Sequence, residues 1–120
     1  MFNAGCLIDR PLQPIARVLL AHGAGAAMDS DYLQQLAAEL LQLGIEVWRF
    51  NFGYMAKTVA GAKQPPSKMP MLLQEMAGVI EMLPEDLPLF IGGKSMGGRV
   101  ATLLASDAAQ LPSHVRGVLV

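Results

Sequence analysis

Two glycine-rich segments, each placed between an apolar run and an amphipathic stretch, constrain the fold of this chain most strongly. The first reads His22-Gly-Ala-Gly-Ala26 and follows the apolar run 16–21. The second reads Gly92-Gly-Lys-Ser-Met-Gly-Gly98 and follows the run 87–91. A buried strand that passes through a tight turn into a helix produces this pattern. Both segments therefore predict strand-turn-helix units.

Strands and helices are predicted to alternate along the rest of the chain. β-branched and aromatic residues predict a strand over 45–50, and another apolar run predicts one over 115–120. The stretch 51–68 is predicted to be a long polar loop. Apolar residues at helical spacing predict three helices. These cover 30–43, 67–83 and about 96–107, with Asp29 or Ser30 as the first cap and Gly44 as the first stop.

This alternation predicts the fold class. Repeated strand-helix-strand units connect through right-handed crossovers, which place parallel strands side by side with helices on their faces. We therefore expect an α/β fold with three layers, α/β/α, around a mostly parallel sheet. A chain of 120 residues has room for one core, and 52% of its residues are hydrophobic. Residues 1–120 are expected to form a single domain.

Composition excludes several other classes of protein. A net charge of −1 provides no basic surface for nucleic acid. Apolar runs fall far short of the roughly 18 residues that span a bilayer, and the first ten residues lack the pattern of a secretory signal. Cys6 is the one cysteine, so no intrachain disulfide forms and a cytoplasmic location is expected. One cysteine and two distant histidines predict no metal site, and we expect no cofactor.

The second glycine segment contains the pattern G-x-S-x-G, as Gly93-Lys94-Ser95-Met96-Gly97. A serine on a tight strand-to-helix turn is held in a strained conformation, and the residues two before and two after it must be small. Gly93 and Gly97 meet this requirement. The turn lifts the hydroxyl above the carboxyl end of the sheet, so Ser95 is the candidate nucleophile.

Two main-chain N–H groups are candidates to stabilise negative charge beside Ser95. Met96 opens the predicted helix, where N–H groups favour anions. The second donor is expected from the first glycine segment, where small residues allow the main chain to approach a ligand oxygen. We prefer the N–H of Ala24 for this role and keep that of Gly25 as the alternative.

These motifs resemble those of the α/β-hydrolase superfamily, and more narrowly a bacterial group of predicted hydrolases. Relatives in that group carry HGAGA, RF-x-F-x-YM, a PP loop and GGKSMGGR, which read here as 22–26, 49–55, 65–66 and 92–99. The likeness covers roughly 16–120, which is part of the family's usual length. It implies a Ser95 nucleophile, oxyanion donors at Met96 and Ala24, and a small ester or related acyl substrate. Asn51 departs from the pattern, because relatives often have Asp there.

The catalytic acid and base are not identifiable from the sequence. In this superfamily they follow the serine, and Asp107 and His114 stand in that order. A helix rises about 1.5 Å per residue, which puts Asp107 about 18 Å from Ser95. His114 precedes the next parallel strand and is expected about 17 Å away, at the opposite edge of the sheet. His22 lies at the correct edge, but we expect it to orient its turn rather than to exchange protons.

Other functions fit the same residues less well. Gly93-Lys94-Ser95 matches the end of a nucleotide-binding P-loop, but the first glycine would fall at Pro88. Gly23 and Gly25 begin a dinucleotide fingerprint whose third glycine is replaced by Met28, and Glu46 lies too early in its strand to bind a ribose.

A third reading is a non-catalytic interaction scaffold that retains the hydrolase fold. The chain looks like an amino-terminal part of that fold, and the strand 115–120 would leave an apolar edge open. We expect this edge to pair with a second copy or with a missing carboxyl-terminal half. For Trp48, Arg49 and Tyr54, packing or an ion pair is expected rather than contact with substrate.

Overall fold

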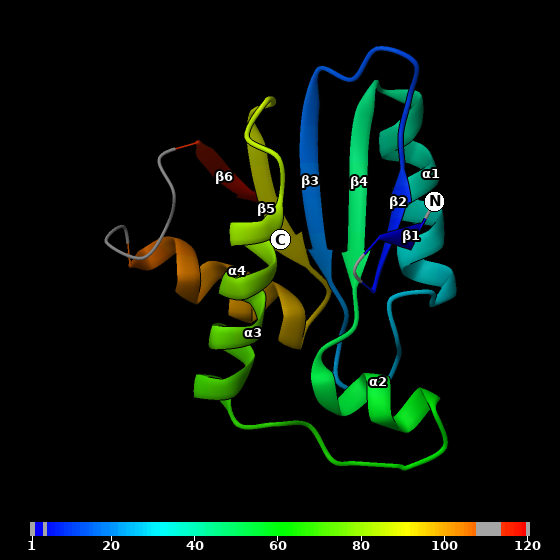
Figure 1. The fold of residues 1–120 in the computed structure, drawn as a ribbon, viewed down its shortest axis with the longest axis vertical. Coiled ribbons are helices and arrows are strands. Elements are labelled where there is room, and N and C mark those ends of the chain that lie inside the picture. The colour runs from blue at the N-terminus through cyan, green and yellow to red at the C-terminus, as the bar shows by residue number, and fades with distance from the viewer. Residues whose placement is uncertain (1, 4, 108–113, 120) are drawn as a thin grey trace.

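A mostly parallel sheet forms the middle layer of the computed structural model, which describes residues 2–3, 5–107 and 114–119 (Figure 1). Neighbouring strands in its parallel part are joined in the order β4-β3-β5-β6. These strands are β3 (Ala16–Ala21), β4 (Ile45–Phe50), β5 (Leu89–Gly93) and β6 (Val115–Leu119). The predicted fold class is confirmed, and each of these strands lies within two residues of its predicted position. Val120, the last residue of the predicted strand, lies outside the described residues.

Two short strands that the sequence did not predict extend the sheet beyond β4. Strand β2 (Cys6–Asp9) pairs antiparallel with β4, and β1 (Phe2–Asn3) pairs antiparallel with β2. Segments of two and four residues are too short to show a period. Their pairing with β4 defines them, and the turn between them uses Gly5 at a φ of +82°.

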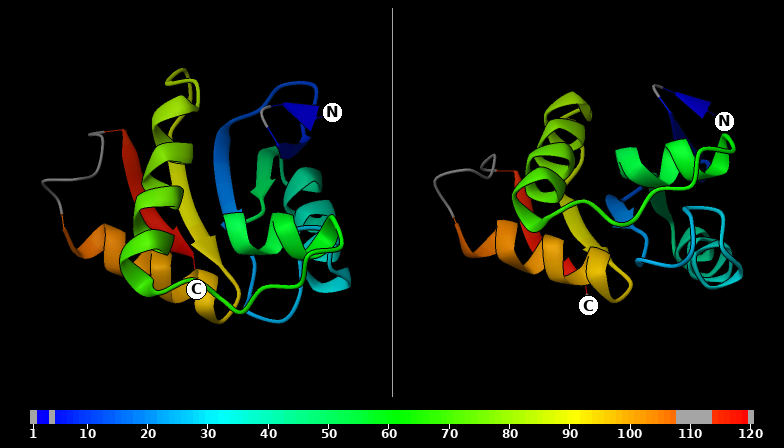
Figure 2. Two further views of the ribbon diagram at one scale, coloured as in Figure 1. Left: turned by 60° about the horizontal axis from the view of Figure 1, so that its bottom comes forward. Right: turned by 90° about the horizontal axis from the view of Figure 1, so that it is seen from below.

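Helices cover both faces of the sheet (Figure 2). On one face, helix α1 (Asp31–Gln42) packs Leu33 and Ala37 against Val18, Leu20 and Val47. On the other face, helices α3 (Met69–Met82) and α4 (Met96–Ser106) form a larger core with alternate residues of the same strands. Successive strand residues point to opposite faces, so Val18 and Leu20 enter one core and Leu19 and Ala21 the other.

Local sequence signals set the ends of the first helix. The Ser30 side chain accepts a hydrogen bond from Leu33 N at 3.4 Å, so Ser30 rather than Asp29 is the cap. Gly44 follows the helix at a φ of +84°, as its predicted stop requires. Helix α3 begins at Met69, two residues later than predicted, with Lys68 in the capping position and proline in the first turn.

A further helix, α2 (Gly53–Val59), corrects the prediction of a loop over 51–68. The Glu75 carboxylate on α3 accepts a hydrogen bond from Gly53 N at 3.0 Å and so stabilises the start of α2. Tyr54 and Met55 are buried in the core beneath it. Seven residues give a weak periodic signal, and the capping group comes from another helix. Helix α2 lies beyond the carboxyl ends of β3 and β4 (Figure 1).

The opposite end of the sheet is held by buried charges. Arg17 on β3 and Glu46 on β4 form an ion pair, and both residues are at most 2% exposed. Arg10 Nε and Trp48 Nε1 also donate to the Glu46 carboxylate, each at 2.7 Å. Burial favours the protonated acid, but these hydrogen bonds outweigh it and hold the pKa of Glu46 below its usual range. Glu46 therefore joins the strands at their amino ends, opposite the carboxyl ends where ligands bind in sheets of this kind.

Candidate active site

Ser95 occupies a strained position at the end of β5. Its φ of 54° and ψ of −113° make it the one non-glycine residue with positive φ among the described residues. An L-residue rarely adopts this conformation, and such strain persists where the surrounding structure enforces it. The turn from β5 into α4 supplies that constraint and places Ser95 at the carboxyl edge of the sheet.

Gly93 and Gly97 allow the turn to pack directly against the end of β3. A Cβ atom on Gly93 would lie 2.5 Å from Ala21 O and 2.7 Å from the carbonyl carbon of Gly97. A Cβ atom on Gly97 would lie 2.5 Å from the carbonyl oxygens of both Ala21 and His22. Main-chain atoms fill both spaces, so the glycines are required by contact rather than by their own φ angles.

The turn and the loop after β3 lie side by side, as the sequence predicted for two segments at one sheet edge. A Cβ atom on Gly23 would lie 3.3 Å from Lys94 O and 3.7 Å from Ser95 Cβ. A hollow of about 310 Å³ lies between these segments. It is lined by Gly23, Ala24, Gly25, Ala26, Ser30, Leu33, Lys94 and Ser95.

His22 is fully buried and both of its ring nitrogens have main-chain partners. Phe52 N donates to Nε2 at 3.0 Å, so the proton resides on Nδ1, which donates to Gly23 O at 2.6 Å. Burial lowers the pKa of His22, which keeps the ring neutral. The ring thus joins the loop after β3 to the start of α2, in line with the orienting role expected for it.

Residues at the carboxyl end of β4 and directly after it complete the frame around this loop. Asn51 Oδ1 accepts a hydrogen bond from Met28 N at 2.9 Å, and Arg49 donates to Met28 O at 3.0 Å. Arg49 also pairs with Asp9 at 3.2 Å, which agrees with the predicted ion pair. Since Met28 N donates, the position of Asn51 needs an acceptor oxygen, which Asn and Asp both provide. Contacts of this kind join distant segments and leave no signal in a single sequence.

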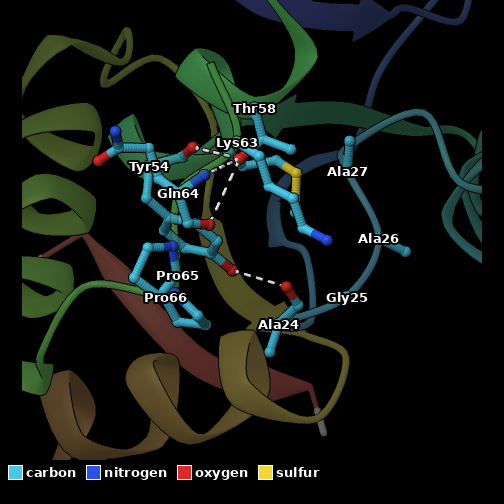
Figure 3. Close-up of a pocket in the computed structure, with 11 residues that line it drawn as sticks. Ala24, Gly25, Ala26, Ala27, Tyr54, Thr58, Lys63, Gln64, Pro65 and Pro66 are labelled. Carbon is cyan, nitrogen blue, oxygen red and sulfur yellow. Dashed lines mark hydrogen bonds between the residues drawn. The ribbon is translucent and has the colours of Figure 1, made fainter. Parts of the chain in front are cut away.

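A larger pocket opens on the α2 side of the same loop (Figure 3). Its volume of about 550 Å³ is in the range of small-molecule sites, which is roughly 300–1,000 Å³. The side chains around it are mostly apolar, and they come from the loop after β3, from α2 and from the segment that follows α2. They belong to Ala24, Gly25, Ala26, Ala27, Tyr54, Met55, Thr58, Lys63, Gln64, Pro65 and Pro66.

Asp107 and His114 do not join this site. Asp107 follows the far end of α4, whose 11 residues extend about 16 Å at 1.5 Å per residue. The His114 carbonyl accepts from Leu89 N at the start of β5, and its ring lies 3.5 Å from Glu85 Oε1. Ser95 follows the other end of β5, about 20 Å away along an extended strand.

The local structure also differs from a P-loop and from a metal centre. Strand β5 begins directly after Pro88, so no loop precedes Ser95 that could surround phosphates. Lys94 instead extends over the ring of Tyr32, with Nζ 4.7 Å from the ring centroid. Within residues 2–3, 5–107 and 114–119, no group of three or more His, Cys, Asp or Glu side chains could hold a metal ion. Nor is any helix in these ranges long and apolar enough to cross a membrane.

Solved structures of two hydrolytic enzymes and of a serine hydrolase homologue share this fold. A dienelactone hydrolase from Anabaena variabilis matches with a TM-score of 0.77 and 20% identity over 94% of this chain and 54% of that one. A carboxyl esterase from Bacillus coagulans matches with a TM-score of 0.75 and 19% identity, over 94% of this chain and 37% of the esterase. An alpha-beta serine hydrolase homologue from Coxiella burnetii matches with a TM-score of 0.71 and 20% identity, over 86% of this chain and 51% of the homologue. No curated protein matches the sequence.

The chain spans about half the length of the dienelactone hydrolase and of the serine hydrolase homologue. A family model described as an alpha/beta hydrolase domain matches residues 14–120, which include both glycine segments and every parallel strand. The chain therefore belongs to the alpha/beta hydrolase family.

Proposed function

We propose that this protein is a serine hydrolase that cleaves an ester or a related acyl compound with Ser95 as nucleophile. The observation that carries the proposal is the strained Ser95 backbone, held beside a second main-chain segment at the carboxyl edge of the sheet. Ser95 Oγ attacks the acyl carbon, and its proton passes to a base as the carbonyl oxygen becomes negative. The alcohol then leaves with a proton, and water hydrolyses the acyl-enzyme.

The proposed oxyanion donors are the N–H groups of Met96 and Ala24. Met96 is the first residue of α4, where N–H groups have no acceptor within the helix. The Gly23 carbonyl is held by His22 Nδ1, and a trans peptide points its N–H opposite to its carbonyl. The N–H of Ala24 therefore points away from the buried ring of His22. This geometry supports Ala24 as the second donor.

The proposed site for the acyl or alcohol group is the pocket between the loop after β3 and α2. The pocket shares Ala24, Gly25 and Ala26 with the hollow at Ser95. A substrate whose carbonyl lies at Ser95 could therefore extend past Ala24 into an apolar space. Apolar side chains favour a hydrocarbon group, so we propose an ester with such a group.

The base and acid are proposed to come from a segment that pairs with the edge of β6. His22 is neutral and occupied on both nitrogens, and neither Asp107 nor His114 lies at the site. A serine hydroxyl without a base is a weak nucleophile. A carboxyl-terminal half or a second copy of the chain would supply the missing groups.

A single domain over 1–120 and a cytoplasmic location stay predictions.

Labelling with a fluorophosphonate probe tests the proposal. The 120-residue chain, a chain extended by any downstream coding sequence, and their Ser95→Ala variants would be compared. Ser106→Ala is the matched control, because Ser106 lies at the far end of α4, where its hydroxyl donates to Leu103 O at 2.7 Å. We expect at least one of the two chains to be labelled. Ser95→Ala should abolish this labelling, and Ser106→Ala should retain it. Absence of labelling from both chains contradicts the proposal.

A non-catalytic scaffold is the second candidate, favoured by the edge of the sheet. Strand β6 has a neighbour on one side within the described sheet, and Leu119 on it is 42% exposed. An open apolar edge promotes pairing with another strand. Analytical ultracentrifugation of the 120-residue chain should then show a dimer whose formation does not require the Ser95 hydroxyl. A folded monomer at high concentration would count against this candidate.

A further inference from the structure

We propose that Tyr54 is a positioning residue for the oxyanion hole, acting through its hydroxyl on both main-chain segments that carry the proposed donors. This inference rests on the proposed hydrolase function. Tyr54 lies on α2, outside both glycine segments, and reaches the loop after β3 and the first residue of α4 together.

The contacts of one hydroxyl carry the inference. Tyr54 Oη donates its one proton to Ala24 O at 3.1 Å and lies 3.9 Å from Met96 Sδ, in contact with that side chain. The dashed line from Tyr54 to Ala24 in Figure 3 marks the first of these contacts, at the rim of the larger pocket. Ala24 and Met96 are the residues whose N–H groups are proposed to bind the oxyanion. One side chain therefore contacts both residues that carry the proposed donors.

The direction of the Ala24 carbonyl gives the hydroxyl a specific effect. With Ala24 O held toward α2, the N–H of Gly25 points away from α2, because a trans peptide sets the two groups opposite each other. His22 does the same for the preceding peptide by holding Gly23 O. Two successive N–H groups, those of Ala24 and Gly25, are thus fixed by anchors on their carbonyls. Both alternatives for the second donor depend on these anchors.

The surroundings of Tyr54 keep the hydroxyl in place and protonated. The residue is 5% exposed, and its ring packs edge-on to His22 with centroids 5.9 Å apart. Burial raises the pKa of Tyr54, so the phenol remains a donor at neutral and moderately alkaline pH. The His22 ring that contacts Tyr54 is itself held by a hydrogen bond from Phe52 N to its Nε2. Preorganised donors of this kind avoid rearrangement when charge develops.

Replacing Tyr54 by Phe tests the role of the hydroxyl and keeps the ring in the pocket wall. The matched control is Tyr32→Phe, because Tyr32 is the other of the chain's two tyrosines and is 55% exposed on α1. Labelling by a fluorophosphonate would be measured against probe concentration for whichever chain labels. Loss of one whole oxyanion donor slows such reactions by about 100-fold to 1,000-fold, so we expect about a ten-fold lower maximal rate for a displaced donor. The half-saturating probe concentration should stay unchanged.

A second readout keeps the test independent of the chemistry. Amide resonances and hydrogen-exchange rates of Ala24, Gly25 and Met96 would be compared in the 120-residue wild type, Tyr54→Phe and Tyr32→Phe. We expect shifted resonances and faster exchange in Tyr54→Phe alone, with the circular dichroism spectrum unchanged. Wild-type values at all three amides, or an unchanged labelling rate, would overturn the inference. If no chain labels, the proposed function fails, and the amide data still decide whether Tyr54 positions these groups.

Discussion

The contact between Gly97 and the end of β3 leads to a quantitative prediction for Gly97→Ala. A methyl group there would lie 2.5 Å from two carbonyl oxygens and 2.6 Å from the carbonyl carbon of Ala21. The Ala21 atoms belong to β3, the strand that pairs with both β4 and β5, and the His22 carbonyl follows it directly. As main-chain atoms they cannot rotate away as a side chain would. Overpacking of this kind costs about 1–3 kcal/mol, and we expect the upper part of that range.

Gly78→Ala provides the matched control for this change. Gly78 lies inside helix α3, is exposed, and would place its Cβ atom with nothing within 4 Å. Alanine is favoured over glycine in a helix by about 0.5–1 kcal/mol, and both variants gain this contribution. The difference between them therefore isolates the steric contact.

Urea unfolding of the 120-residue chain, followed by circular dichroism, measures both variants. Gly78→Ala should unfold at higher urea than wild type and Gly97→Ala at lower urea, with similar slopes. The free energies of unfolding of the two variants should differ by about 3 kcal/mol. Equal stability of Gly97→Ala and Gly78→Ala would refute the argument that main-chain contact, rather than chance, requires glycine after the serine.

The remaining predictions concern strain, charge, pH and the pocket. Ser95→Gly should stabilise the fold by about 1 kcal/mol, because glycine accepts the positive φ, and calorimetry that shows no rise in Tm would contradict the strain. Glu46→Gln should destabilise it by less than the roughly 3–5 kcal/mol that an uncompensated buried charge costs, since Arg17 loses its buried partner but keeps the exposed Asp86, and urea unfolding at pH 7 measures the change. The folded-state pKa of His22 lies below its unfolded value, so the unfolded chain binds more protons and stability should fall as pH drops below about 6.5. A His22→Asn variant that keeps the same decline would assign it to another group. Ala27→Leu should narrow the larger pocket and slow the hydrolysis of octanoyl more than acetyl esters; equal slowing of both would place the acyl group elsewhere.

The parts of the fold that the sequence predicts correctly have local causes. The strand 45–50 and the helix capped at Ser30 follow from residue type, spacing and a cap within a few positions. The glycines around Ser95 are recognisable because a tight turn requires small residues at fixed offsets. The predicted proximity of Ala24 to Ser95 follows from a general rule, that parallel strands end at one edge.

The features that escaped prediction depend on contacts between distant segments. Helix α2 is capped by Glu75 across 22 positions, and Tyr54 reaches Met96 across 42. The pairing of Arg17 with Glu46 joins two strands at the far end of the sheet. None of these partners is specified by spacing, because each becomes a neighbour only after the sheet has formed. A single sequence therefore predicted the tight turn at Ser95 but not the side chains that hold its surroundings.

The buried charges at the amino ends of β3 and β4 lie far from the loops that form the pocket, so the two regions can change independently in evolution. Arg17 and Glu46 hold the strands together at one end, while the loops that surround Ser95 lie at the other. Variation in the loops from Ala24 to Ala27 and from Lys63 to Pro66 alters the pocket without touching that charged contact. Under the proposed hydrolase function, new substrate preferences would therefore arise at the carboxyl ends of the strands, while the charged contact at the amino ends continues to stabilise the fold that holds Ser95 in its strained conformation.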